Sequence, residues 1–194
     1  MTFLQAQSRD LIQAREVLVD ELKNVFQHSS IQSFIRLEVP CEKLNILAWL
    51  KAQPFSVKTY WLDREHRFEM GGIGWADRRT SQETLSFPTL FAHLQAHLPL
   101  KYPHLRYYGG MRFSPQHTIS PLWKPFGSYF WLIPRFEVYQ APEQSYFVCN
   151  LAPHDSTSLN DLLEELNQVY MISNSSLDPL PVLTTRRDFP EKSQ

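Results

Sequence analysis

The sequence has 194 residues, of which 43% are apolar and 13% aromatic, so the chain can bury a sizeable core and we expect one globular domain. Lysine and arginine number 19 against 20 aspartate and glutamate, and the net charge of -1 gives no field that would gather nucleic acid or an anionic membrane. The two distant cysteines, Cys41 and Cys149, suggest neither a disulfide framework nor a zinc knuckle, and with no signal peptide and no apolar run of roughly 18 residues we expect a soluble, cytoplasmic protein.

The N-terminal region is predicted to form a long amphipathic helix and then a strand. From Leu4 to Phe26, apolar residues recur at three, four and seven positions, which is the spacing of one buried helical stripe. Between residues 33 and 39, apolar side chains alternate with a second set that includes Arg36 and Glu38. This period of two predicts a strand with one buried face, which Pro40 closes.

The next segments predict a short helix and a hairpin. Apolar residues between positions 44 and 50 fit a helix that ends near Pro54, because proline cannot continue a helix. Residues 57–62 and 66–70 are rich in strand-forming side chains, and the turn-forming residues 63–65 separate them.

A second amphipathic helix is predicted after Ser86, which is a suitable N-cap, with Pro88 in the first turn and Pro99 as the stop signal. The apolar residues of its buried face are Leu90, Phe91, Leu94 and Leu98.

The C-terminal part is predicted to contain three strands and one more helix. Residues 105–113, 128–139 and 144–151 are aromatic and β-branched. Ser156, Thr157 or Ser158 can cap a helix whose apolar residues extend to Tyr170, and residues 182–194 are a polar tail. The sequence therefore predicts a mixed α/β (α+β) fold with largely antiparallel sheets and outer helices.

Three histidines offer the one pattern that suggests metal binding. His93 and His97 are four residues apart on the predicted second helix, and His104 follows nearby. Both helix histidines lie off the apolar stripe and no HExxH glutamate accompanies them, so we interpret them as a solvated helix face.

The remaining motifs favour structural interpretations. Neither the glycines of residues 71–75 nor Gly109-Gly110 match a phosphate-binding loop, and glycine in a strand usually reflects backbone geometry. Cys149 lies in an apolar run, where a buried, unreactive thiol is expected. Two arginines and a lysine in the tail, Arg186, Arg187 and Lys192, are a weak signal for an anion site.

Two segments resemble the N-terminal region of isochorismate synthases. Residues 106–115 (RYYGGMRFSP) resemble a strand and turn of the form GG-x-x-F-D/S-P. Residues 130–137 (FWLIPRFE) look like that family's aromatic strand ending in L-P-R-[FW]-E. The order and spacing of the two segments match.

Other segments extend the resemblance to roughly residues 30–192. Residues 35–40 (IRLEVP), 47–50 (LAWL) and 72–74 (GIG) resemble the opening strand, helix and hairpin of menaquinone-pathway isochorismate synthases. Residues 184–192 (TTRRDFPEK) look like the junction that opens the catalytic half in this family. The apolar stripe predicts an N-terminal amphipathic helix at 1–28. The resemblance implies the N-terminal α/β region of the chorismate-utilising (anthranilate synthase-like) fold at 29–180 and the start of the junction at 181–194.

The family resemblance implies a magnesium-dependent conversion of chorismate to isochorismate. In that reaction a lysine activates water for attack at ring carbon C2, and a glutamic acid assists departure of the C4 hydroxyl. In relatives these residues and the magnesium ligands lie beyond the position matching Gln194. We therefore assign no catalytic, metal or chorismate-binding residue in 1–194, and read Gly109, Gly110, Pro134 and Arg135 as structural.

The expectation is then an inactive N-terminal fragment, with no cofactor of its own, that needs the catalytic half of the enzyme to meet chorismate. Such a fragment should expose strand edges and apolar surface and be prone to aggregation. Two alternatives stay open. The chain can be a non-catalytic module or remnant that binds a partner, or a fragment of a salicylate or anthranilate synthase.

Overall fold

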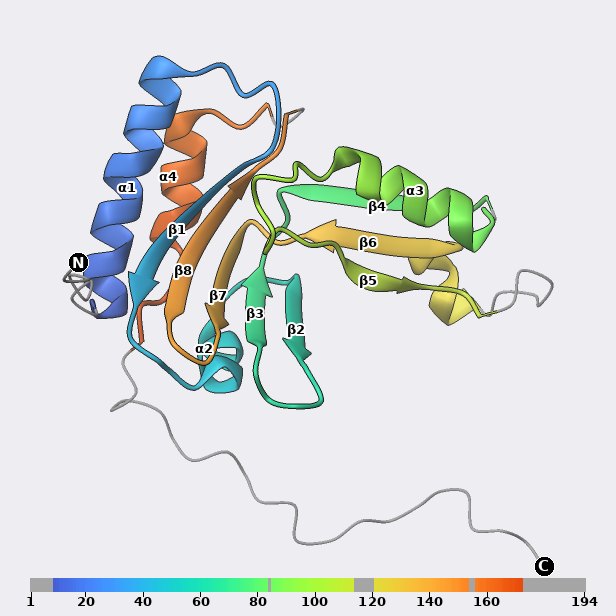
Figure 1. The fold of residues 1–194 in the computed structure, drawn as a ribbon, viewed down its shortest axis with the longest axis horizontal. Helices are drawn as coiled ribbons and strands as arrows, with labels where there is room; N and C mark the ends of the chain where they lie inside the picture. Colours follow the sequence, from blue (N-terminus) through green and yellow to red (C-terminus); the bar gives the residue numbers. More distant parts are fainter. Residues whose placement is uncertain (1–8, 84, 114–120, 154–155, 173–194) are drawn as a thin grey trace, which may run out of the picture.

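The computed structural model describes residues 9–83, 85–113, 121–153 and 156–172. The helices within these residues are α1 (Leu11–His28), α2 (Ile46–Ala52), α3 (Phe87–His97) and α4 (Leu159–Asn167), with a 3-10 turn η1 (Pro121–Phe126). The strands are β1 (Ile35–Cys41), β2 (Lys58–Leu62), β3 (Glu69–Ile73), β4 (Asp77–Ser81), β5 (Tyr108–Met111), β6 (Tyr129–Ile133), β7 (Phe136–Gln140) and β8 (Ser145–Leu151). The strand pairings are antiparallel, which confirms the predicted mixed α/β fold with antiparallel sheets and outer helices (Figure 1).

The larger sheet has five strands in the order β1-β8-β7-β3-β2. Its helix-covered face packs against α1, α2 and α4, and the buried core there includes Leu18 of α1, Trp49 of α2 and Leu162 of α4 (Figure 1). The register pairs Ile35 of β1 with Leu151 of β8, so a strand early in the chain lies beside one more than a hundred residues later. The apolar residues predicted to be buried on α1, α2 and α4 therefore contribute to the core between these helices and the larger sheet.

Helix α1 begins at Leu11, because the Asp10 carboxylate caps it by accepting a hydrogen bond from the Gln13 N–H at 2.8 Å. The predicted start at Leu4 lies outside the described residues. The helix ends at His28, two residues beyond the predicted Phe26.

Strand β1 corrects the sequence prediction in two ways. It continues through Pro40 to Cys41, which an edge strand tolerates because one side of its backbone has no strand to donate to. Its second face is also not a solvent face, since Arg36 is only 5% exposed.

The predicted helix near Pro54 and the hairpin after it are confirmed as α2, β2 and β3. The turn is longer than predicted because the Asp63 carboxylate accepts hydrogen bonds from the N–H groups of Arg67 and Phe68. Strand β3 therefore runs over residues 69–73 instead of 66–70, and it includes two of the glycines that the sequence suggested as a bend.

The smaller sheet has three strands in the order β4-β6-β5. Helix α3 packs against one of its faces, with Leu90 and Leu94 buried and the Phe91 ring 6.1 Å from Trp131 of β6. The predicted cap is confirmed, since Ser86 Oγ accepts a hydrogen bond from the Thr89 N–H. Strand β4, which the sequence did not predict, pairs with β6 along its whole length.

The single strand predicted at residues 128–139 is wrong, because this segment forms two strands in different sheets. Strand β6 belongs to the smaller sheet and β7 to the larger one, and Pro134 and Arg135 separate them. Here the Ile133 carbonyl accepts from the Ala76 N–H, whereas the Arg135 N–H donates to Ile73. Pro134 has no N–H to donate, so the backbone changes pairing partner at this point.

The last predicted helix is confirmed as α4, with a capping box between Ser158 and Asp161. The predicted loop, tail and junction from residue 173 onward lie outside the described residues. Within the part of the chain that the structure describes, no helix is long and apolar enough to cross a membrane.

Candidate functional site

The histidines considered as metal ligands are not brought together. His93 and His97 are exposed on α3, and the His97 Nδ1–H donates to the His93 carbonyl at 2.6 Å. His104 instead packs against Tyr139 of the larger sheet, with the ring centroids 5.5 Å apart. Among the described residues, no group of three histidine, cysteine or carboxylate side chains is placed to hold a metal ion.

Two glycines of the family-like motifs, Gly72 and Gly109, occupy crowded places, whereas Gly110 has no atom within 4 Å of an added Cβ. A Cβ atom on Gly72 would lie 2.5 Å from Cγ of Pro134, so the hairpin glycine and the proline of the L-P-R motif fit against each other. A Cβ on Gly109 would lie 2.0 Å from the Phe130 carbonyl oxygen. These contacts support the structural interpretation of Gly109 and Pro134.

Charged and polar residues from three strands meet on the face of the larger sheet that α1, α2 and α4 leave free. The Arg36 Nη1–H of β1 donates to Glu137 of β7 at 3.0 Å and to Asn150 of β8 at 3.1 Å. Asn150 Nδ2 donates to the other Glu137 oxygen at 2.7 Å, and Arg36 Nε donates to Glu38 at 2.5 Å. We call Arg36, Glu38, Glu137 and Asn150 the buried charge cluster.

Burial controls the electrostatics of this cluster. Removal from water raises the pKa of Glu137, and the charge and hydrogen bonds of Arg36 and Asn150 only partly oppose that effect. Burial alone would lower the pKa of Arg36, yet the two carboxylates raise it overall. Arg36 is therefore held as a cation between Glu137 and Glu38.

Tyr108 of the smaller sheet extends the cluster across to the other sheet. Burial and then the charge of Glu137 raise the pKa of its phenol. Its hydroxyl and the Arg36 Nη2 are both buried without a hydrogen-bond partner among the described residues. The cluster is thus a junction between the two sheets, and its burial denies a substrate access to Glu137.

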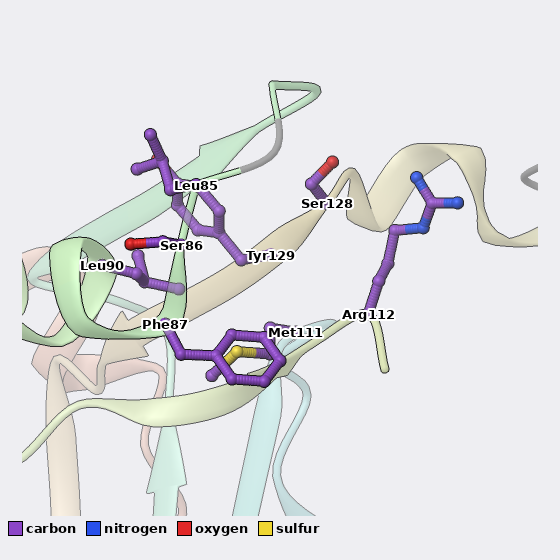
Figure 2. Close-up of a pocket in the computed structure, with 8 residues that line it drawn as sticks. All are labelled: Leu85, Ser86, Phe87, Leu90, Met111, Arg112, Ser128 and Tyr129. Atoms are coloured by element: carbon purple, nitrogen blue, oxygen red, sulfur yellow. The ribbon is translucent and has the colours of Figure 1, made fainter. Parts of the chain in front are cut away.

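A separate cavity of about 290 Å³ lies between α3 and the smaller sheet (Figure 2). Figure 2 shows Leu90 on one side of it and Arg112 and Ser128 on the other. Its walls are Leu85, Ser86, Phe87, Leu90, Met111, Arg112, Ser128 and Tyr129. Ser86 already caps α3 and the Ser128 hydroxyl donates to the Gln82 carbonyl, so the lining lacks a nucleophile paired with a base.

Large aromatic side chains are exposed on faces that no described helix covers. On the smaller sheet, Phe130 of β6 pairs with Thr80 of β4, and the side chains of both residues point away from α3. Phe126 packs on Phe130 at 5.8 Å, Trp123 packs on Phe126 at 5.6 Å, and the Arg78 guanidinium lies 4.8 Å over Trp75. The exposed fractions are 41% for Trp75, 60% for Trp123 and 49% for Phe126.

The larger sheet also leaves an aromatic side chain uncovered. Trp61 pairs with Met70 and so lies on the side opposite the α2 contacts, where it is 53% exposed. Such exposed aromatic residues match the expectation of an uncovered apolar surface, and they are typical of surfaces that bind another polypeptide.

Sequence reasoning quoted the three charged residues of the buried charge cluster and Tyr108 without placing them together. Arg36 and Glu38 lie in the IRLEVP segment, Glu137 ends the L-P-R-F-E segment and Tyr108 begins the YGG strand. The available signal was a charged residue inside a predicted strand whose other residues are mostly apolar. The cavity beside α3 had no such signal.

The sequence pattern that defines the chorismate binding enzyme family matches residues 20–189 of this chain. The match covers most of the described fold, including both sheets.

The fold is similar to the solved structure of MenF, the menaquinone-specific isochorismate synthase from Escherichia coli, with a TM-score of 0.58 and 23% sequence identity. The similarity covers 91% of this chain but 37% of the MenF chain, so this chain spans little more than a third of that protein's length.

Proposed function

This chain belongs to the family of chorismate binding enzymes, and we propose that it is the N-terminal part of an isochorismate synthase, the enzyme that converts chorismate to isochorismate. The observation that carries the proposal is the fold similarity over 91% of the chain to a menaquinone-specific isochorismate synthase. The family-like motifs support it, because their residues form the junction between the two sheets.

The proposed role of this part is to support catalysis that occurs elsewhere. We infer from the family resemblance that the lysine base, the glutamic acid and the magnesium ligands lie outside residues 1–194. The carboxylates of the buried charge cluster, Glu38 and Glu137, both bind Arg36, so they do not fit a magnesium ion. We therefore propose that the chain alone has no isochorismate synthase activity.

The chain is proposed to act by packing its uncovered faces against the catalytic part of the enzyme. Trp61 lies on the free face of the larger sheet, and Trp75, Trp123 and Phe126 lie on that of the smaller sheet. Their burial against another polypeptide would remove apolar surface from water, at roughly 25 cal/mol for each Å².

A second candidate function rests on the same surface. A free-standing, non-catalytic module would use those aromatic residues to bind a separate protein. A fragment of a salicylate or anthranilate synthase is the other alternative, and the reaction product distinguishes it.

The test is reconstitution of activity. Purified 1–194 is mixed with the separately purified catalytic part of an isochorismate synthase from the same organism, and isochorismate is measured with chorismate and magnesium. We expect no turnover from 1–194 alone and magnesium-dependent turnover from the mixture. Turnover by 1–194 alone would contradict the proposal, and salicylate or anthranilate as the product would support another reaction of the family.

A further inference from the structure

The charge of this chain is unevenly distributed. Residues 74–133, which contain the smaller sheet, α3 and η1, hold six lysines and arginines but two acidic residues, although the whole chain has a net charge of -1. The smaller sheet is therefore the basic part of a weakly acidic chain.

Several of these cations lie beside exposed aromatic rings. The Arg78 guanidinium lies over the Trp75 ring, and Lys124 lies between Trp123 and Phe126 in the sequence of η1. Both Arg78 and Lys124 are exposed. Tryptophan and arginine are the residues most enriched at the centres of protein interfaces, and charges around them set the choice of partner.

The register places Arg78 and Phe130 on one side of the smaller sheet, and a hydrogen bond places η1 on that same side. Arg78 pairs with Leu132, and Thr80 with Phe130, whereas Trp131 points to the opposite side, where α3 packs. The hydroxyl of Thr80 donates to the Phe126 carbonyl, which fixes η1 on the side away from α3. We call Trp75, Arg78, Trp123, Lys124, Phe126 and Phe130 the aromatic-basic face.

We propose that the aromatic-basic face binds the catalytic part of the enzyme, and that the occupant presents an apolar centre surrounded by aspartate and glutamate carboxylates. This inference rests on the proposed function, because this chain spans 37% of the MenF chain and the occupant is sought in the remainder of such an enzyme. The carboxylates would pair with Arg78 and Lys124 while apolar groups cover Trp75, Trp123 and Phe126.

Other occupants fit this face less well. A two-fold dimer through the same surface would set Arg78 and Lys124 of one copy against those of the other. A nucleic acid needs a continuous basic track, and the aromatic-basic face offers two exposed cations.

The experiment measures binding of 1–194 to the separately purified catalytic part by calorimetry. We expect the double variant R78E/K124E to weaken binding by about tenfold or more, since like charges would face each other. Raising NaCl from about 50 mM to about 500 mM should weaken wild-type binding in the same direction. The control K23E/K51E makes the same charge change at exposed positions on α1 and α2, and it should leave the affinity unchanged.

The outcomes separate the two proposals. Wild-type binding with restored activity that neither R78E/K124E nor salt weakens would overturn the aromatic-basic face and leave the proposed function intact. No binding and no restored activity by the wild-type chain would overturn the proposed function and this inference with it. A salt-resistant dimer of 1–194 that R78E/K124E leaves intact but W123S dissociates would assign the face to self-association instead. Retention of 1–194 on heparin would assign the face to nucleic acid.

Discussion

Arg36 and Glu137 form an ion pair of 3.0 Å across 101 positions of sequence, and each side chain is only 1% exposed. The pair joins the edge strand β1 to β7, although β8 lies between these two strands in the sheet. Because both charges have left water, the pair behaves differently from the exposed ion pairs of the surface.

Removing one charge of this pair should be strongly destabilising. We expect Glu137→Gln to lower the free energy of unfolding by about 3–5 kcal/mol, because Arg36 would stay buried beside a single, half-exposed carboxylate. Urea denaturation checks it. Asp20→Asn, which breaks the exposed pair with Lys23, is the control and should change stability by less than about 0.5 kcal/mol.

Removing the hydroxyl of Tyr108 should not destabilise the protein. The hydroxyl is buried without a partner among the described residues, so Tyr108→Phe should leave the free energy of unfolding unchanged or raise it by up to about 1 kcal/mol. Tyr139→Phe is the matched control, because that hydroxyl donates to Glu38 at 3.3 Å and its loss should cost about 1 kcal/mol. A large loss of stability in Tyr108→Phe would mean that the hydroxyl does have a partner.

Substitution by alanine should destabilise the protein at one glycine of the family-like motifs and leave its stability unchanged at another. In Gly72→Ala the new Cβ would meet the Pro134 ring at 2.5 Å, and such overpacking should cost about 1–3 kcal/mol. Gly110→Ala meets no atom within 4 Å, so we expect no loss of stability. Thermal unfolding of the two variants, recorded by circular dichroism, decides the matter. Equal losses would disprove the packing explanation.

The thiols should be unreactive in the folded protein. Cys41 and Cys149 are buried, and burial, with a smaller effect of Glu42, raises the pKa of Cys41 to about 12. The thiolate is the reactive form, so a thiol reagent at mildly alkaline pH should modify neither cysteine until denaturant is added. Rapid modification of Cys41 in the native state would show that β1 opens readily.

The cap of α4 should give stability that depends on pH. Hydrogen bonds from Ser158 lower the pKa of Asp161 below its ordinary 3.8. A lowered pKa in the folded state means that the contribution is present above the ordinary pKa and is lost as the pH falls through the folded value. Asp161→Asn should therefore melt below the wild type at neutral pH, and the two melting temperatures should converge in acid. A constant difference would contradict this role.

Local sequence signals predicted the elements that depend on local chemistry. Ser86 and Ser158 cap α3 and α4 as expected, because a side-chain oxygen satisfies an N–H within the next three residues. Strand β4 was missed because its residues, DRRTS, have no apolar alternation, and its pairing with β6 makes it a strand. The division of residues 128–139 was missed because a run of aromatic and β-branched residues does not indicate which sheet each half joins.

The candidate site shows the same division between local and distant information. The sequence alone identified the motif that ends in Glu137, and its structural interpretation of Gly109 and Pro134 agrees with the crowded contacts. It placed Arg36 on a solvent face, because its buried partners Glu137 and Asn150 lie more than a hundred residues away. The aromatic-basic face depends on the register of β4 against β6, which the sequence did not predict.

The pairing of β1 with β8 has a consequence during protein synthesis. Residues 35–41 emerge from the ribosome long before residues 145–151, which supply their hydrogen bonds. At about 5–20 residues per second, β1 waits roughly 5–20 s for its partner. During that delay the nascent chain carries a strand without its hydrogen-bonding partner, and Arg36 lacks the buried carboxylate of Glu137.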